Sequence, residues 1–146
     1  MKDDLVESMK VVLADTFSLY LRAHNYHWNV EGKNFVQLHD FFGDLYGELH
    51  GAIDPIAENI RKLGAYAPGS LERFKQLTTL DEELNVPDDH MMVARLSMEN
   101  DKVMASLRKA YMKAEAMSEI GLSNFLQDRY DVHAKYRWML NSIIKG

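Results

Sequence analysis

The chain has 146 residues, a length typical of one domain and sufficient to bury an apolar core. Hydrophobic residues make up 47% and charged residues 27% of the chain, which favours a folded globular protein over a disordered or fibrous one. Cysteine is absent, so disulfides and thiolate metal sites are excluded. Any bound metal must therefore be held by His, Asp, Glu or water.

The charge distribution gives no sign of a nucleic-acid or membrane partner. The formal net charge is -5, and Lys2 and Lys10 are the only basic side chains among the first ten residues. No cationic arm is available to neutralise phosphates, so DNA binding is not expected. No apolar run approaches the roughly 20 residues that span a bilayer, and the N-terminus is polar rather than signal-like. We expect a single cytoplasmic domain, residues 1–146.

Two long segments of the N-terminal half carry apolar residues at three- and four-residue spacing, which predicts amphipathic helices. The first runs from Leu5 to about Asn29, and the second from about Phe35 to Leu63. The expected buried positions are Leu5, Met9, Val12, Leu13, Thr16, Phe17, Tyr20 and Ala23 in the first, and Leu38, Phe42, Leu45, Leu49, Ala52, Ile53, Ile56 and Ile60 in the second.

The C-terminal half predicts three further helices. A short one, from Ser70 to Leu77 with Ser70 as its N-cap, would cross between the two halves. A long one should begin at Pro87–Asp89, because proline suits a first turn and acids complement the helix dipole, and should run to about Met117. The last should run from about Leu122 to Ile144. The expected buried residues are Leu96, Val103, Leu107, Ala110, Ala114, Phe125, Leu126, Tyr136, Leu140 and Ile143.

These elements predict an all-α fold. No sustained strand alternation is present. Four long helices with a longer middle connection are typical of a ferritin-like four-helix bundle, here with a short extra helix in the crossover between the second and third long helices.

Candidate metal ligands cluster in the first two long helices. An in-chain di-iron centre in such a bundle uses a Glu-x-x-His pair, but no Glu here is followed three residues later by His. A different set stands out: His27 at the end of the first helix, and His39, Asp54 and Glu58 on the second. Imidazole and carboxylate together suit ferrous iron.

The spacing of these ligands predicts a site shared between chains. Asp54 and Glu58 lie one turn apart and can grip one ion together. His39 lies 15 positions before Asp54, about 22 Å along the helix axis. One chain cannot bring both ends of this helix to one metal, whereas two antiparallel copies related by a two-fold axis can, twice per dimer.

Three glycines on the second helix, Gly43, Gly47 and Gly51, are spaced four apart on one stripe. Each interior glycine costs a helix about 1 kcal/mol relative to alanine. The stripe indicates close approach by another helix, either within the same bundle or from a second copy.

Two stretches of the chain resemble the signature of the Dps family of mini-ferritins. The first is the run His24–Gly32 followed by Phe35 and His39, and the second is the run Ile53–Glu58. The run Lys135–Leu140 is similar to the last helix of that family, so the resemblance covers nearly the whole chain. It implies a hollow dodecamer of two-fold dimers that oxidises ferrous iron, preferably with hydrogen peroxide, and keeps the ferric mineral inside. Detoxification and storage are equally implied.

The resemblance also implies roles for individual residues. His27 and His39 of one subunit would face Asp54 and Glu58 of its dimer mate and hold iron. Trp28 matches the tryptophan beside the family's ferroxidase site, where it could intercept radicals; an interface aromatic without a redox role is the alternative. By position, Glu119 and Asp128 match the acids of the family's three-fold iron-entry pore, Asn124 replaces an expected acid, and Asp131 could contribute. Ordinary solvated charges are the alternative for these acids.

This sequence departs from the family pattern at one ligand position. Many members carry an acid one turn after the second histidine, which supports a second iron, but here that position is Gly43, with Asp44 next to it. Occupancy of a second iron site is therefore open. His24 and His50 fall near the ligands, but we expect them to be hydrogen-bonded structural residues. We expect His90 and His133 at the surface or in packing.

Three other functions compete with iron oxidation. A DNA-compacting Dps protein is disfavoured because a lysine-rich tail is missing. A shell with inactive metal sites is disfavoured because all four ligands are present. Another di-metal oxidase of the bundle class is disfavoured because Glu-x-x-His is absent.

Overall fold

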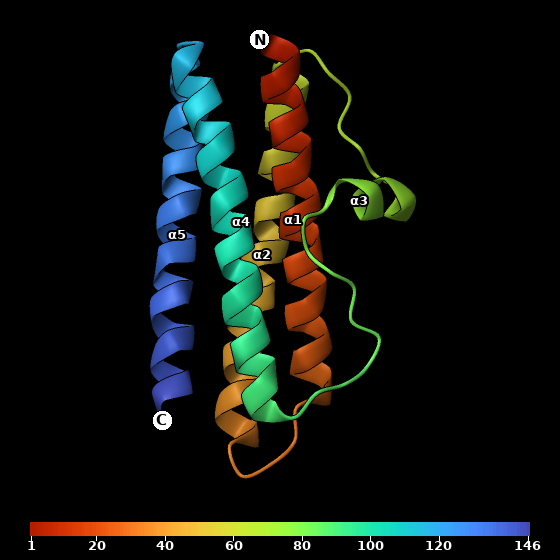
Figure 1. Ribbon diagram of the computed structural model, residues 1–146, viewed down its shortest axis with the longest axis vertical. Helices are drawn as coiled ribbons and strands as arrows, with labels where there is room; N and C mark the ends of the chain where they lie inside the picture. The colour runs from red at the N-terminus through yellow and green to blue at the C-terminus, as the bar shows by residue number, and fades with distance from the viewer.

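The computed structural model describes all 146 residues, which form five helices and no strand. The bundle consists of α1 (Lys2–Asn29), α2 (Phe35–Lys62), α4 (Asp89–Ala116) and α5 (Ile120–Lys145), and α3 (Leu71–Leu77) lies in the crossover (Figure 1). The predicted all-α bundle with a short extra helix is confirmed.

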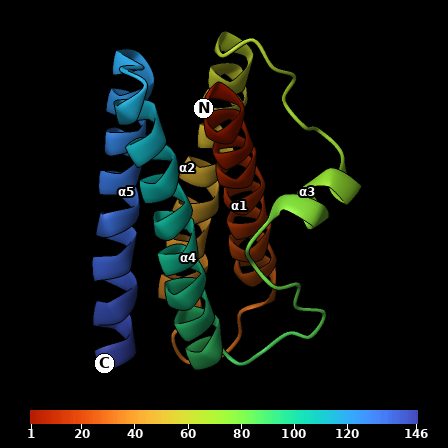
Figure 2. The ribbon, with the colours of Figure 1, turned by 45° about the horizontal axis from the view of Figure 1, so that its top comes forward.

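The crossover sets the topology of the bundle. α1 and α2 form one antiparallel hairpin, and α4 and α5 form the other (Figure 1). From the end of α2, the chain descends along the outer side of α1, through α3, to the start of α4 (Figures 1 and 2). α2 and α4 therefore run in the same direction, which a short loop could not achieve.

Local capping explains where two of the helices begin. The Ser70 hydroxyl oxygen accepts a hydrogen bond from the backbone N–H of Arg73 at 3.3 Å at the start of α3. The Asp88 carboxylate accepts one from the N–H of Met91 at 2.8 Å at the start of α4. Pro87 was expected in the first turn, but it precedes the cap because Asp88 occupies that position.

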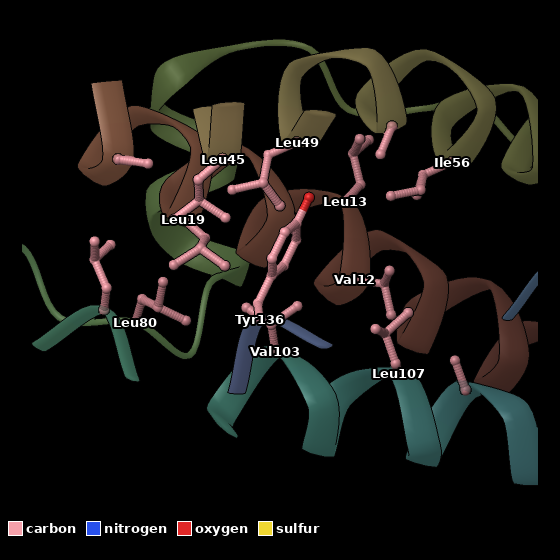
Figure 3. Close-up of a cluster of buried hydrophobic side chains, with 14 of the residues drawn as sticks. Val12, Leu13, Leu19, Leu45, Leu49, Ile56, Leu80, Val103, Leu107 and Tyr136 are labelled. Atoms are coloured by element: carbon pink, nitrogen blue, oxygen red, sulfur yellow. The ribbon is translucent and has the colours of Figure 1, made fainter. Parts of the chain in front are cut away.

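The apolar core lies between the four long helices, and α5 contributes Leu122, Leu126, Leu140 and Tyr136 to it; Figure 3 shows part of this core, with Tyr136 reaching in from α5. α1 is the central helix, because it packs against α2, α4 and α3, whereas α5 packs against α4. Most of the expected positions are buried. Five are not: Phe17, Tyr20, Ile53 and Phe125 are half-buried and Ile143 is 37% exposed. Phe17 packs instead against Phe74 of α3, with ring centroids 4.7 Å apart.

A buried carboxylate ties the crossover to the bundle. Asp15 of α1 is fully buried and accepts hydrogen bonds from both Thr79 groups, the backbone N–H and the hydroxyl, at 2.7 and 2.8 Å. The hydroxyls of Thr78 and Ser106 donate to it at 2.7 and 2.6 Å. One side chain thus joins α1, the crossover and α4.

A second polar cluster lies between α2, α4 and α5. His133 is fully buried; its Nδ1 donates to the Asn100 side-chain oxygen at 2.8 Å, and Arg129 donates to its Nε2 at 2.9 Å. Arg129 also pairs with Glu48 of α2, which accepts a hydrogen bond from the Tyr136 hydroxyl at 2.5 Å. Of the two positions expected for His133, at the surface or in packing, the structure shows packing. The packing is polar, because both ring nitrogens have partners. Burial, and next the charge of Arg129, lower the pKa of His133 to about 3.

None of the five helices combines the length and apolarity needed to cross a membrane.

Candidate metal centre

His27 and His39 form a side-chain pair where α1 ends and α2 begins. The short connection between the helices brings the two imidazoles into a stack, with ring centroids 3.8 Å apart and planes 16° from parallel. His27 Nδ1 hydrogen-bonds the backbone oxygen of His39 at 2.7 Å, and His39 Nδ1 hydrogen-bonds that of His27 at 2.7 Å. The His27 carbonyl lies in the last turn of α1, where helical N–H partners run out.

These reciprocal bonds determine the tautomer of both rings. A carbonyl oxygen only accepts hydrogen bonds, so each Nδ1 must carry the proton. In a neutral imidazole the Nε2 lone pair is then free to bind a metal. A backbone bond to the second nitrogen is also the usual way in which a metal-binding histidine is oriented. The pair therefore presents two oriented nitrogen donors.

The neighbours of the pair hold both rings in place. Phe35 stacks on His39, with ring centroids 5.0 Å apart and planes at 22°. A Cβ at residue 43 would lie 3.1 Å from Cε1 and Nδ1 of His27, so Gly43 leaves the room that the His27 ring occupies. A tight contact within the chain thus accounts for Gly43.

The other two glycines of the stripe have no such neighbour. A Cβ at Gly47 or Gly51 would meet nothing within 4 Å, and both residues are exposed. Packing within the chain does not account for them, and close approach by a second copy stays a prediction at these two positions.

Asp54 and Glu58 lie on the same open face of α2. Both are exposed, and neither has a hydrogen-bond or salt-bridge partner in the chain. α2 is continuous from Phe35 to Lys62, so Asp54 remains about 22 Å from His39 along the axis. The structure brings the two histidines together, and no group of three or more His, Asp or Glu able to hold a metal forms within one chain.

Sequence and structure comparisons place this geometry in a family. The ferritin-like domain matches residues 7–146. An uncharacterized low temperature-induced protein of Nostoc sp. is 37% identical over 92% of this chain and 76% of its own length. DNA protection during starvation protein 2 of Bacillus anthracis is 26% identical over 99% of both chains.

A solved structure agrees with these relatives. The Dps protein of Vibrio cholerae O1, described as a member of a broad superfamily of ferritin-like diiron-carboxylate proteins, superposes with a TM-score of 0.93. It is 26% identical and covers 98% of this chain and 90% of its own. The chain belongs to the Dps family of mini-ferritins.

In this Dps protein, Trp28 follows His27 on α1 and packs against His24. It is 60% exposed, and His24 is sandwiched between its ring and that of Tyr46, at centroid distances of 4.0 and 3.9 Å. His24 Nδ1 is hydrogen-bonded to the Tyr20 hydroxyl at 3.1 Å. Burial, and then the neighbouring His27 and His50, lower the pKa of His24.

The acids considered for a pore lie along α5 rather than in one cluster. Glu119 is the N-cap residue of α5, and Asp128 and Asp131 are exposed further along. The three span about 18 Å of helix. Glu119 borders a cavity of about 290 Å³ together with Lys62 of α2. The pore assignment stays a prediction about the assembled shell.

Proposed function

We propose that this Dps protein oxidises ferrous iron at sites shared by two subunits and stores the ferric product in a hollow shell. The observation that carries the proposal is the His27–His39 pair, whose reciprocal Nδ1 hydrogen bonds leave both Nε2 lone pairs free for a metal. Iron is the substrate here, and the donor set of imidazole and carboxylate suits it.

The arrangement of α2 supports a site across a two-fold axis. Asp54 and Glu58 of the partner subunit would complete the coordination if two α2 helices lay antiparallel. Gly47 and Gly51 have no neighbour within the chain and permit close contact between these helices. A homo-oligomer built from such dimers, a dodecamer in this proposal, would place two sites in each dimer.

The side chains divide the chemical work between them. The two imidazoles fix the ion at the end of the helical hairpin, while the two carboxylates stabilise the ferric product. Four protein donors leave a coordination position at which an oxidant can approach. With hydrogen peroxide as the oxidant, two ferrous ions, one peroxide and two protons give two ferric ions and two water molecules, so no hydroxyl radical is released.

Trp28 and the α5 acids have secondary roles in this proposal. Trp28 is exposed, one residue after His27 on α1, and would intercept oxidising by-products there. Glu119, Asp128 and Asp131 would attract ferrous ions to an entry pore between subunits.

Protection of DNA is the second function to consider, because a relative carries the name DNA protection during starvation protein. A net charge of -5 and the scarcity of basic residues near the N-terminus oppose direct binding to phosphates. Removal of peroxide and ferrous iron would protect DNA without contact. A gel-shift assay at low salt separates the two: retarded DNA would support direct binding.

The test of the proposal is anaerobic ferrous titration of the assembled protein, followed by peroxide. His39→Ala and Glu58→Ala are each expected to abolish fast oxidation while leaving the oligomer intact. His90→Ala is the matched control, because His90 is an exposed histidine on α4. Unchanged oxidation rates in the first two variants would contradict the assignment of the site.

A further inference from the structure

His50 was expected to be a hydrogen-bonded structural histidine, and the structure shows otherwise. Its side chain is exposed and makes no hydrogen bond or salt bridge in the chain. Its one aromatic neighbour is Tyr20, with ring centroids 5.1 Å apart. Both imidazole nitrogens are therefore available to a ligand.

His50 also has the right position on α2. At 3.6 residues per turn, four side chains lie within an arc of about 100° around the axis of α2. They are His39, His50, Asp54 and Glu58. His50 lies one turn, about 6 Å, before Asp54. His50, Asp54 and Glu58 thus form a row of three donors on consecutive turns.

The part of the site that supplies the histidines also presents a row of imidazoles, with His24 and His27 on α1 and His39 on α2. His24 precedes His27 by nearly one turn of α1, and its Nδ1 is bound to the Tyr20 hydroxyl at 3.1 Å. The Tyr46 ring lies parallel to it, 3.9 Å away and 7° from coplanar, and fixes its plane. Nε2 of His24 has no partner in the chain, and it carries the lone pair when Nδ1 donates its proton to the Tyr20 oxygen. In that tautomer His24, His27 and His39 each present a free nitrogen.

The two rows meet in the antiparallel dimer on which the proposed function rests. If His39 lies opposite a point between Asp54 and Glu58 of the partner subunit, the two-fold axis passes near residues 47 and 48. The partner subunit's His50 then lies opposite about residue 45, beside Tyr46 and the His24 ring stacked on it.

We propose that a second divalent metal ion binds beside the first, held by His24 of one subunit and His50 of the partner subunit, with the partner subunit's Asp54 between the two ions. A side chain at residue 43 could not serve instead, because a Cβ there would press on the His27 ring. A position with two imidazoles and one carboxylate suits zinc, cobalt or ferrous ions and disfavours magnesium and calcium.

The test is metal binding alone, without oxidation. Zn²⁺ is titrated calorimetrically into the assembled protein, and Co²⁺ is titrated with its visible absorption as the readout. His50→Ala and His24→Ala are each expected to bind one ion fewer per subunit than the unaltered protein, or to bind it about tenfold more weakly or worse. His90→Ala, an exposed histidine outside both rows, is expected to match the unaltered protein.

The same titration of His39→Ala and Glu58→Ala separates this proposal from the proposed function. If these two variants lose an ion while His50→Ala and His24→Ala bind as the unaltered protein does, the second position is wrong and the first stands. If none of the four variants changes the number or affinity of bound ions, both assignments are wrong.

Discussion

Replacing Asp15 by alanine should release the crossover from the bundle. The fully buried carboxylate accepts four hydrogen bonds of 2.6–2.8 Å. The Thr79 hydroxyl can turn to water after the change because Thr79 is exposed, but Ser106 is only 9% exposed and its hydroxyl is stranded. The half-buried Thr78 hydroxyl also loses its acceptor. At about 1–3 kcal/mol for each of these two donors, the loss of folding stability is about 2–6 kcal/mol. For a domain of this size, at about 3 °C per kcal/mol, that lowers Tm by roughly 6–20 °C.

Thermal unfolding of the assembled protein measures this loss, and limited proteolysis reports where it acts. Asp15→Ala is expected to expose residues 63–88 to cleavage before the four long helices are cut. Asp101→Ala removes an exposed carboxylate of α4 and is the control, with a change in Tm of only a degree or two. A Tm for Asp15→Ala equal to that of the control would show that the hydrogen bonds to Asp15 do not hold the crossover.

Three further changes test other parts of the account. The pKa of His133 falls from 6.5 in the unfolded chain to about 3 in the folded protein, so between these values only the unfolded chain takes up the proton. The free energy of unfolding is therefore highest above pH 6.5 and decreases as the pH falls, by about 2 kcal/mol at pH 5. His133→Gln should have a shallower dependence of stability on pH, and a slope as steep as that of the unaltered protein would contradict this. Glu99→Ala leaves the guanidinium of Arg22, which is 8% exposed, without its carboxylate partner. The free energy of unfolding, measured by equilibrium denaturation, should fall by about 3–5 kcal/mol. A fall below about 1 kcal/mol would show that the pair is not important for stability. Gly43→Ala should raise the stability of α2 by up to about 1 kcal/mol, because alanine favours a helix over glycine. It should also weaken Zn²⁺ binding, because the new Cβ displaces the His27 ring. An unaltered Zn²⁺ affinity in calorimetry would show that Gly43 does not confine this ring.

The helices could be predicted from the sequence because their apolar residues recur at the helical period. Every long helix begins and ends within three residues of its expected bounds. The buried polar residues could not be predicted, because their partners are distant in the chain: Asp15 meets Thr78 and Ser106, which lie 63 and 91 positions away. A charged residue in a periodic pattern gives no sign of whether such partners exist.

The candidate site was only partly open to prediction. Residue type and spacing singled out His27, His39, Asp54 and Glu58, and the 22 Å separation along α2 pointed to a second chain. The tautomer of the histidines depends on backbone carbonyls of the opposite helix, which appear only after folding. His50 was set aside for the same reason, since its lack of partners is a property of the folded surface.

The central claim is that histidines of one subunit and carboxylates of another form each site, and co-assembly of two inactive variants tests it directly. Each mixed dimer of His39→Ala and Glu58→Ala subunits would contain one site with both defects and one intact site, which takes its histidines from the Glu58→Ala subunit. Random mixing in equal amounts should therefore restore about a quarter of the peroxide-driven ferrous oxidation of the unaltered protein. Activity no higher than that of either variant alone, in shells shown to contain both subunits, would mean that the site does not cross the subunit boundary.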